Sequence, residues 1–466
     1  MEDAVRLYKL GSSCLGGVGA QKGGRLVLSL FFKAVLGVQR IFHFDSLTDC
    51  GFALLTGGRR ILSRDVLGGL VRAVSTRAVG KFLRLSQPIR KSARHFALSI
   101  DEHVVARFTR KFLIPKGFHT IRNKHMRSEK LFFSFDIGSR SLLDLVVTPG
   151  NGRLARVASK MLSALRSSCR RAKLRVVLDA GAAQSHRELL KLADENHNHV
   201  LLVRAPRRSG YLERWKALPE EHFAHYDEPG RYKGAPAKRI HITQTKTSIR
   251  VDKRSPARLV RTIVAREEKR RGKDRWHALF VFGDDATDAL SLIKEFRARQ
   301  HHEQTYRILL HDAFVDTAPS GYFKKSPNPD RPGFRKNAIT LYAWLAGLAV
   351  NVLTSFTASL PKRFKLAHPR TLRRWWLNFP ADLYLSEKAL FVVFRPWWFR
   401  GWWERKIIAL NAKKLRVPWL GDRLVFYSLD APVQHGAEPS SDPGIRPPGV
   451  WCSLCTSHWW RRAFAT

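Results

Sequence analysis

The stretch from residue 95 to residue 205 constrains the fold most, because short apolar runs alternate there with longer amphipathic ones. Three β-type runs come first, HFALSID, KLFFSFDI and LLDLVVT. Four more runs follow, ARVASKMLSALRSSCRRA, LRVVLD, SHRELLKLADEN and HVLLVRAP. Their lengths and apolar spacings predict three strands, then helix, strand, helix, strand. In SHRELLKLADEN, Ser185 and Glu188 form a capping box that marks the helix start.

This order predicts an α/β fold, an RNase H-like mixed sheet flanked by helices. A helical N-terminal domain precedes the sheet, and an inserted, mostly-β subdomain interrupts it, because residues 206–275 are polar and turn-rich. The predicted organisation is a helical DNA-binding region at 1–92, the first part of the catalytic core at 93–205, the β-rich insertion at 206–275, the second part of the core at 276–362, a C-terminal region at 363–430 and a disordered tail at 431–466.

The chain is strongly basic, with 83 Lys and Arg against 38 Asp and Glu and a net charge of +45 over 466 residues. A compact protein with that charge repels itself, and a polyanion relieves the repulsion. The basic residues are spread along the chain among apolar ones, which favours an extended nucleic-acid-binding surface. A basic surface that is merely solvated is the simpler alternative, and the size of the charge argues against it.

Two segments have more than one interpretation. SRDVLGGLVRAVSTRAVGKFLRL, with Ser63 and Ser75 or Thr76 as helix caps, fits a helix-turn-helix or two packed helices that bind nothing. AITLYAWLAGLAVNVLTSFTASL, residues 338–360, is long enough to span a bilayer. Its Asn351 and its Ser and Thr residues favour a buried core helix instead.

Two of the predicted strands run straight into a carboxylate, FALSID into Asp101 and LRVVLD into Asp179. An Asp at a strand end is often only a cap or part of a turn. In the predicted sheet, however, the first and fourth strands are neighbours, so the two carboxylates lie side by side. Adjacent carboxylates repel each other, and a divalent cation is their natural partner. Only small residues follow Asp179, which leaves room for an ion and a DNA backbone.

A long helix predicted over ATDALSLIKEFRARQHHEQTYRILLHD supplies a third carboxylate. At 100° per residue, Phe296, Arg299, Glu303, Tyr306 and Leu310 fall within roughly 40° of Leu292, on the stripe that packs on the sheet. Charges on that stripe must be paired or bind a metal. An Arg299–Glu303 ion pair is the simpler account. Three carboxylates, Asp101, Asp179 and Glu303, can hold two Mg²⁺ ions (or Mn²⁺) roughly 3.5–4 Å apart for phosphodiester displacement.

With LSIDEH, VVLDAG and FRARQHHEQTYR, the chain resembles a DDE transposase of bacterial insertion sequences, over residues of about 50 to 429. That family's Glu helix carries Tyr-x₂-Arg-x₃-Glu-x₆-Lys. Phe296, Arg299 and Glu303 match the spacing, with Phe in place of Tyr. Leu310 stands at the Lys position with His311 beside it, so a terminal-phosphate role does not carry over directly. Phe296, Tyr306 and His311 are expected to support the site.

The resemblance implies a transposase that cuts element ends and joins them to target DNA by two-metal phosphodiester transfer. Its implied partners are double-stranded DNA, as terminal inverted repeats and target, and a second copy of the chain in a synaptic complex. We expect a cytoplasmic, nucleoid-associated bacterial protein, because Met1-Glu2-Asp3 opens no signal peptide. Two alternatives stay open, a decayed relative that binds DNA without cutting it and a basic membrane-associated protein built on 338–360.

A basic segment at 107–130 lies between the first two predicted core strands, close to Asp101. Its only acid is Glu129. We expect its basic side chains, together with Arg299, to contact DNA phosphates, although a basic hairpin loop facing water gives the same pattern. The predicted DNA contacts in this segment are Arg107, Arg110, Lys111, Lys116, Arg122, Lys124, Arg127 and Lys130.

Overall fold

A computed structural model of the chain divides into two compact units. The first comprises Met1–Ser86, Ile308–Gly321 and Asn337–Thr466, and the second Gln87–Arg307 and Tyr322–Lys336. The structure describes residues 1–88, 95–108, 115–119, 122–168, 173–228, 237–252, 254–268, 274–319, 322–323, 333–334, 336–365, 367–377, 381–395 and 399–429.

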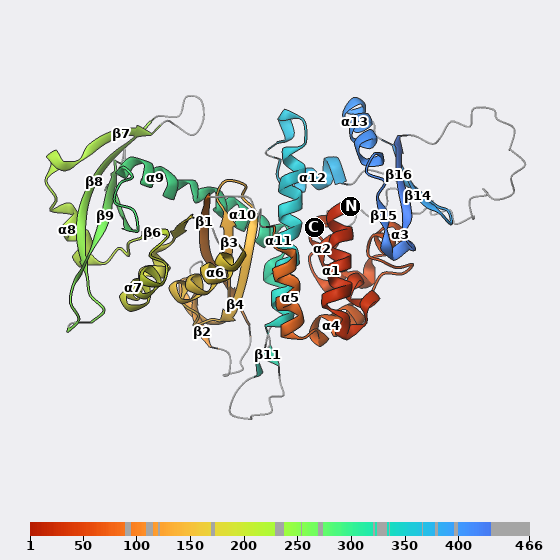
Figure 1. Cartoon of the computed structure of the whole chain (residues 1–466), viewed down its shortest axis with the longest axis horizontal. Coiled ribbons are helices and arrows are strands. Elements are labelled where there is room, and N and C mark those ends of the chain that lie inside the picture. The colour runs from red at the N-terminus through yellow and green to blue at the C-terminus, as the bar shows by residue number, and fades with distance from the viewer. Residues whose placement is uncertain are drawn as a thin grey trace, which may run out of the picture. The chain divides into compact units, whose positions relative to one another are not determined.

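The second unit is built on a ten-stranded sheet in which strands run in the order β2-β3-β1-β5-β6-β10-β9-β8-β7, with β4 paired to β3 (Figure 1). β1 is antiparallel to β3 and parallel to β5, and β5 is parallel to β6. The first and fourth core strands are therefore neighbours, which confirms the predicted RNase H-like α/β sheet. The strands are β1 His95–Ala106, β2 Lys116–His119, β3 Lys124–Asp136, β4 Leu142–Pro149, β5 Lys173–Leu178, β6 Val200–Arg204, β7 Ala224–Glu228, β8 Lys238–Ile249, β9 Arg258–Glu267 and β10 Arg275–Phe282.

Helices cover both faces of this sheet because its central strands are apolar on both sides. α6 Leu154–Ser168, α7 His186–Glu195 and α8 Ser209–Lys216 pack into one core cluster with the side chains of Val176 and Val203. α9 Ala289–Ala298 packs into a second cluster, on the face that carries Val177 and Leu202. The predicted cap of α7 is present, since the Ser185 hydroxyl accepts a hydrogen bond from the N–H of Glu188 at 3.4 Å.

The prediction that residues 206–275 lie outside the core sheet is wrong. β9 pairs with β10 from Arg275↔Glu267 to Val281↔Arg261, and β8 and β7 extend the same sheet. The polar, turn-rich sequence of this region belongs to antiparallel strands near the sheet edge that pair with their neighbours in sequence, and only the pairing of β10 with β6 joins them to the core.

The predicted long helix is two helices, α9 and α10 Gln300–His311, with a turn at Arg299. α9 packs on the strands from β5 to β8, whereas Tyr306 of α10 packs on Phe133 and Phe135 of β3. The turn lets each helix follow its own part of the sheet.

The first unit holds the helical N-terminal region and the apolar helix. Ser63 caps α4 and Ser75 accepts a hydrogen bond at the start of α5, as predicted. α11 packs against α2, α4 and α5 rather than in the catalytic core where the sequence placed it. The helices are α1 Glu2–Cys14, α2 Ala20–Leu36, α3 Cys50–Leu55, α4 Arg64–Ala73, α5 Thr76–Ser86 and α11 Asn337–Ala358.

α11 is the single helix among the described residues that is long and apolar enough to cross a membrane, and 72% of its most apolar part is buried inside the protein. Its indole at Trp344 donates a hydrogen bond to Ser86 Oγ at 2.8 Å. A helix that is apolar all round needs neighbours on every side, and α11 has them in this unit.

The C-terminal region adds a four-stranded sheet, β13-β14-β16-β15, with α13 beside it. The hairpin predicted at DLYLSEKALFVVF is present as β13 and β14. The predicted disordered tail at 431–466 lies outside the described residues. The elements of this region are α12 Pro369–Leu372, a π-helical turn Arg373–Leu377, β13 Ala381–Leu385, β14 Ala389–Phe394, α13 Arg400–Asn411, β15 Arg416–Val417 and β16 Arg423–Leu429. A small pair of strands, β11 Tyr322–Phe323 and β12 Gly333–Phe334, belongs to the second unit.

Candidate functional site

The structure brings Asp101 and Asp179 together at the centre of the large sheet. Ile100 of β1 pairs with Leu178 of β5 in a parallel register, so the aspartates that follow them emerge at adjacent positions. Their side chains are 23% and 36% exposed, which leaves the pair open to solvent on one side. The neighbourhood predicted from the sequence is confirmed for these two residues.

Arg299 supplies the positive charge at this pair. Its Nη1 lies 2.9 Å from Asp101 Oδ2 and its Nη2 lies 3.5 Å from Asp179 Oδ1. The Arg299 side chain is 10% exposed. The predicted contact between Arg299 and DNA is therefore not available in this arrangement, because the guanidinium is buried on the two carboxylates.

The pKa of Asp101 is raised to about 6, because burial and the negative charge of Asp179 together outweigh the opposing charge of Arg299. The Asp101 carboxylate also accepts a hydrogen bond from the N–H of Glu102 at 2.8 Å. Tyr306 lies on the same face, and burial first, then the charge of Asp101, raises the pKa of its phenol well above the usual value. Its buried hydroxyl has no hydrogen-bond partner among the described residues.

Glu303 is not part of this group, and its predicted place on the buried stripe is wrong. It is exposed on α10, where Thr305 and Leu309 are the buried positions among the described side chains 303–311. The helical periodicity does not continue through the turn at Arg299, so the stripe shifts. In the described part of the chain, Arg299 pairs with the aspartates and forms no ion pair with Glu303. Of the other supporting residues, Phe296 is partly buried below the Arg299 guanidinium, and His311 is exposed at the end of α10.

Carboxylate oxygens suit a hard divalent cation, so the aspartate pair fits one such ion. Within the described ranges, no three His, Cys, Asp or Glu side chains gather at a place that could hold a metal. The three-carboxylate set that two ions require is thus not assembled among the described residues, and the guanidinium of Arg299 lies between the two aspartates instead.

The predicted DNA contacts at 107–130 have different surroundings. Arg107 pairs with the fully buried Glu129, and Lys130 Nζ lies 3.0 Å from Glu102, so both have acidic partners inside the fold. Lys116, Arg122 and Lys124 are exposed, and Arg127 is half-buried. Arg110 and Lys111 lie outside the described residues.

Sequence reasoning did not predict Arg204, whose Nη1 lies 3.5 Å from Asp179 Oδ1. A signal was present, because Arg204 ends the strand next to the one that precedes Asp179 and Arg207 and Arg208 follow it.

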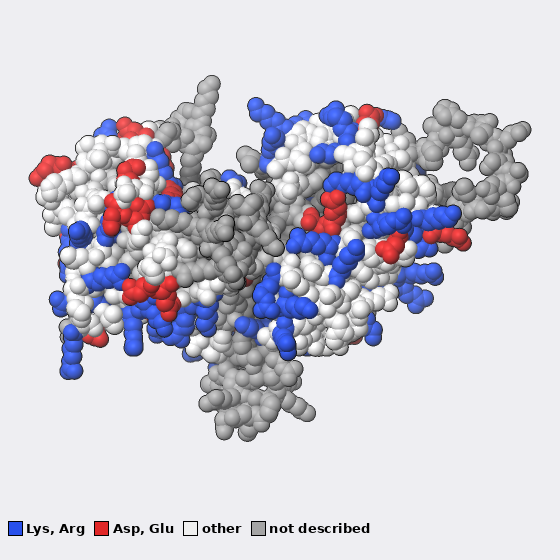
Figure 2. All heavy atoms as spheres, in the orientation of Figure 1, with Lys and Arg blue, Asp and Glu red and all other residues white. Residues whose placement is uncertain are grey.

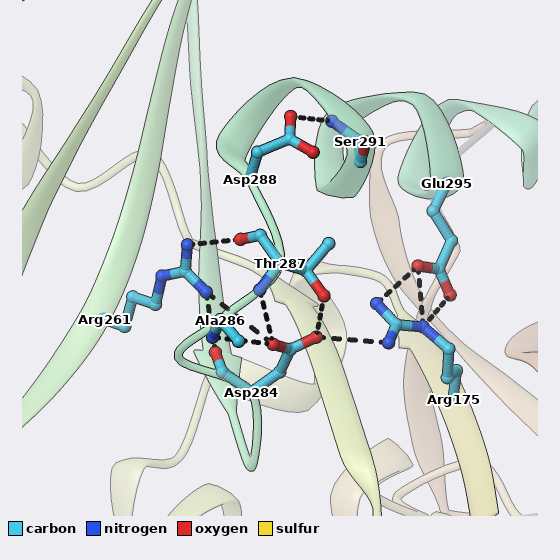
Figure 3. Close-up of polar contacts among 8 residues, drawn as sticks. All are labelled: Arg175, Arg261, Asp284, Ala286, Thr287, Asp288, Ser291 and Glu295. Carbon is cyan, nitrogen blue, oxygen red and sulfur yellow. Dashed lines mark hydrogen bonds and ion pairs between the residues drawn. The ribbon is translucent and has the colours of Figure 1, made fainter.

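A network around Asp284 was also missed (Figure 3). Asp284 Oδ2 accepts hydrogen bonds from Arg175 Nη1 at 3.1 Å and from Thr287 Oγ1 at 2.6 Å. Arg175 Nε donates to Glu295 on α9 at 2.9 Å, and Arg261 Nη1 donates to the Asp284 carbonyl at 2.7 Å. Burial alone would raise the pKa of Asp284, but the bonds from Thr287 and Arg175 lower it to about 2. The network ties β5, β9 and α9 together.

The Asp284→Ala variant should lower the free energy of unfolding by about 2–4 kcal/mol, because it leaves the Thr287 donors without their acceptor and Arg175 with Glu295 alone. Urea denaturation at pH 7 measures the loss. Asp285→Ala is the matched control, since Asp285 is exposed beside it, and it should change the stability by less than about 0.5 kcal/mol. Equal effects of both variants would show that the network does not stabilise the fold.

No family model matches the chain, and no curated protein matches it. Among solved structures, the chain is similar to a piggyBac transposase in a cryo-EM structure of its synaptic complex with hairpin DNA. The two are 11% identical, the alignment covers 80% of this chain and 76% of that chain, and the TM-score is 0.40. A similarity at that level does not by itself assign an activity to the chain.

Proposed function

We propose that this chain is a DNA transposase of the DDE type that cuts and joins DNA strands at the Asp101–Asp179 pair. The observation that carries the proposal is the register of β1 and β5, which places two carboxylates side by side at the centre of an RNase H-like sheet. The net charge of +45 supports DNA as the partner. We also propose that the chain acts as a homodimer in a synaptic complex, that it works in the bacterial cytoplasm, and that its DNA substrates are the terminal repeats of an element and a target.

Asp101 and Asp179 would hold Mg²⁺ or Mn²⁺, which supplies charge stabilisation to a phosphodiester under attack. The remaining chemistry lies with the chain itself. Arg299 holds the two carboxylates in place, and the side of the pair that is open to solvent admits a DNA strand. Glu303 as the ligand of a second ion is a further part of the proposal.

A second function competes with the first, DNA binding by a relative that no longer cuts. Two observations favour it, the guanidinium of Arg299 on both aspartates and the exposure of Glu303. The test uses a supercoiled plasmid that carries the DNA flanking the coding region. Nicking that requires Mg²⁺ or Mn²⁺ supports the transposase, whereas binding without nicking in either metal supports the second function.

Affinity for DNA should fall steeply with salt, because Lys and Arg are distributed over the visible surface of both units (Figure 2). Phosphate contacts release counterions, so the affinity for a random duplex should fall by about 10³-fold or more between 50 and 200 mM salt. Fluorescence anisotropy over that range measures the slope. A slope near zero would contradict electrostatic binding.

A further inference from the structure

Three arginines follow Asp179 on the neighbouring strands β6 and β10 and in the loop after β6. We call them the arginine strip: Arg204, Arg207 and Arg275. Arg204 of β6 pairs with Leu279 of β10, and the N–H of Ala205 donates to the Ala278 carbonyl at 2.8 Å. Side chains alternate along a strand, and residues paired across two strands share a face. Arg204, Arg275 and His277 therefore point to one face of the sheet, the face that carries Asp179.

The strip begins at the aspartate pair, because Arg204 Nη1 lies 3.5 Å from Asp179 Oδ1. β6 lies directly beside β5, and β10 lies directly beside β6. Arg275 lies four residues along β10 from Leu279, the partner of Arg204, so the strip crosses from β5 to β6 and then runs along β10, away from the candidate site.

Arg207 and Arg275 are exposed, and neither forms an ion pair with any described residue. Nearby Arg297 differs, since its guanidinium pairs with Glu228 at 2.8 Å and with Glu267. Partial burial and then the charges of Arg204 and Arg275 lower the pKa of Arg207, while the charge of Glu267 opposes them. Arg204 already has Asp179 as its partner, so an anion bound at the strip would stabilise mainly the charges of Arg207 and Arg275.

His277 lies among these cations as a neutral group. Burial first, and then the charges of Arg297, Arg204, Arg207 and Arg275, lower its pKa to about 3. A neutral imidazole adds no repulsion to the strip, and it still offers one N–H donor. The strip therefore combines guanidinium forks, which match phosphate oxygens in pairs, with a neutral donor.

We propose that Arg204, Arg207 and Arg275 bind the phosphate backbone of the DNA strand whose neighbouring phosphodiester reaches Asp101 and Asp179. This inference rests on the proposed function, because it names the DNA contact of the same site. DNA is the occupant because the strip leads directly to the aspartate pair and because the chain as a whole carries +45. An acidic peptide is the competing occupant.

The test compares two double variants. Arg207→Ala/Arg275→Ala removes the unpaired charges of the strip. The control, Arg214→Ala/Lys216→Ala, removes two exposed charges from α8, whose Trp215 packs in the core cluster on the opposite face of the sheet. Anisotropy of a 5′-labelled duplex of about 20 base pairs at fixed salt gives the affinity, and thermal melting shows that both variants fold.

The strip variant should bind the duplex about 10-fold or more weakly than wild type, and its slope of log K against log salt should be smaller by about 1.8, since two phosphate contacts are lost. The control should stay within about twofold of wild type on the same electrostatic argument. Equal losses in both variants, or no loss in the strip variant, would overturn the proposal. The proposal would also be overturned if poly-glutamate bound the wild type more tightly than the duplex does and this binding were lost in the strip variant.

Nicking of the flanking-DNA plasmid separates this inference from the proposed function. If the wild type nicks the plasmid and the strip variant keeps its DNA affinity, the proposal that the arginine strip binds DNA is wrong, whereas the transposase proposal stands. If wild type never nicks but the strip variant alone loses affinity, the strip binds DNA and the catalytic proposal fails.

Discussion

Asp101→Asn and Asp179→Asn should each reduce Mg²⁺-dependent DNA nicking by roughly a thousandfold. Each substitution removes one of two charged oxygen ligands while the shape is retained, and the loss of several kcal/mol of charge stabilisation corresponds to that factor. DNA affinity should stay within about twofold, because the Lys and Arg contacts that dominate it are elsewhere. Plasmid nicking and duplex anisotropy on the same preparations measure both quantities.

The control for this prediction lies outside the aspartate pair. Glu303→Gln shows whether an exposed carboxylate on α10 takes part: a loss equal to that of the aspartate variants assigns it to the reaction, and unchanged nicking shows that the aspartate pair works without it. Thermal melting of each variant separates lost chemistry from lost fold, since Arg299 is left with one carboxylate partner. Nicking by the Asp179→Asn protein at the wild-type rate would remove the catalytic assignment.

The aspartate pair was predictable because its signals are local. Each strand is a short apolar run that ends in Asp, and the order of strands and helices fixes which strands are neighbours. Ser185 and Ser63 were predictable as caps for the same reason, because a cap and its helix are adjacent in sequence.

Glu303 was misplaced because the chain does not form one continuous helix there. The wheel of a single helix places it beside Arg299, but the chain turns at Arg299, and two shorter helices follow different parts of the sheet. Nothing in the spacing of apolar residues marks that turn, because both halves satisfy the helical period separately. The buried stripe moves to Thr305 and Leu309.

The membership of β7, β8 and β9 in the main sheet was also beyond local reasoning. β10 follows β9 in the sequence and also pairs with β6, and that second pairing connects the whole region to the core. Register across strands that are remote in sequence depends on the packing of one face, which a polar, turn-rich segment does not reveal. The strip residue Arg275 was missed for this reason, since only the β6–β10 pairing places it on the same sheet face as Arg204.

Lys33 on α2 was not singled out by the sequence, although it is among the most buried charged groups of the first unit, at 1% exposure. Its Nζ lies 4.6 Å from the centre of the Tyr342 ring and has no hydrogen-bond partner among the described residues. Burial, with a smaller contribution from the charge of Arg373, lowers the pKa of Lys33 to about 7. Tyr342 stays neutral, because burial raises its pKa.

Lys33→Met should raise the free energy of unfolding at pH 7 by about 2–4 kcal/mol, because it removes a buried charge. The loss of the cation–π contact with Tyr342 reduces this gain. In wild type, the unfolded chain binds one more proton than the folded chain between pH 7 and the ordinary lysine pKa of about 10.4. The stability of wild type therefore rises with pH in that window, by about 1.4 kcal/mol per unit, and the advantage of the variant shrinks by the same amount. Urea denaturation at pH 7 and pH 9 measures the change, with Lys22→Met, an exposed position on the same helix, as the control expected to show neither effect. Two outcomes would contradict the lowered pKa of Lys33. One is a variant that is less stable than the wild type at pH 7, and the other is a gain in the free energy of unfolding that is the same at both pH values.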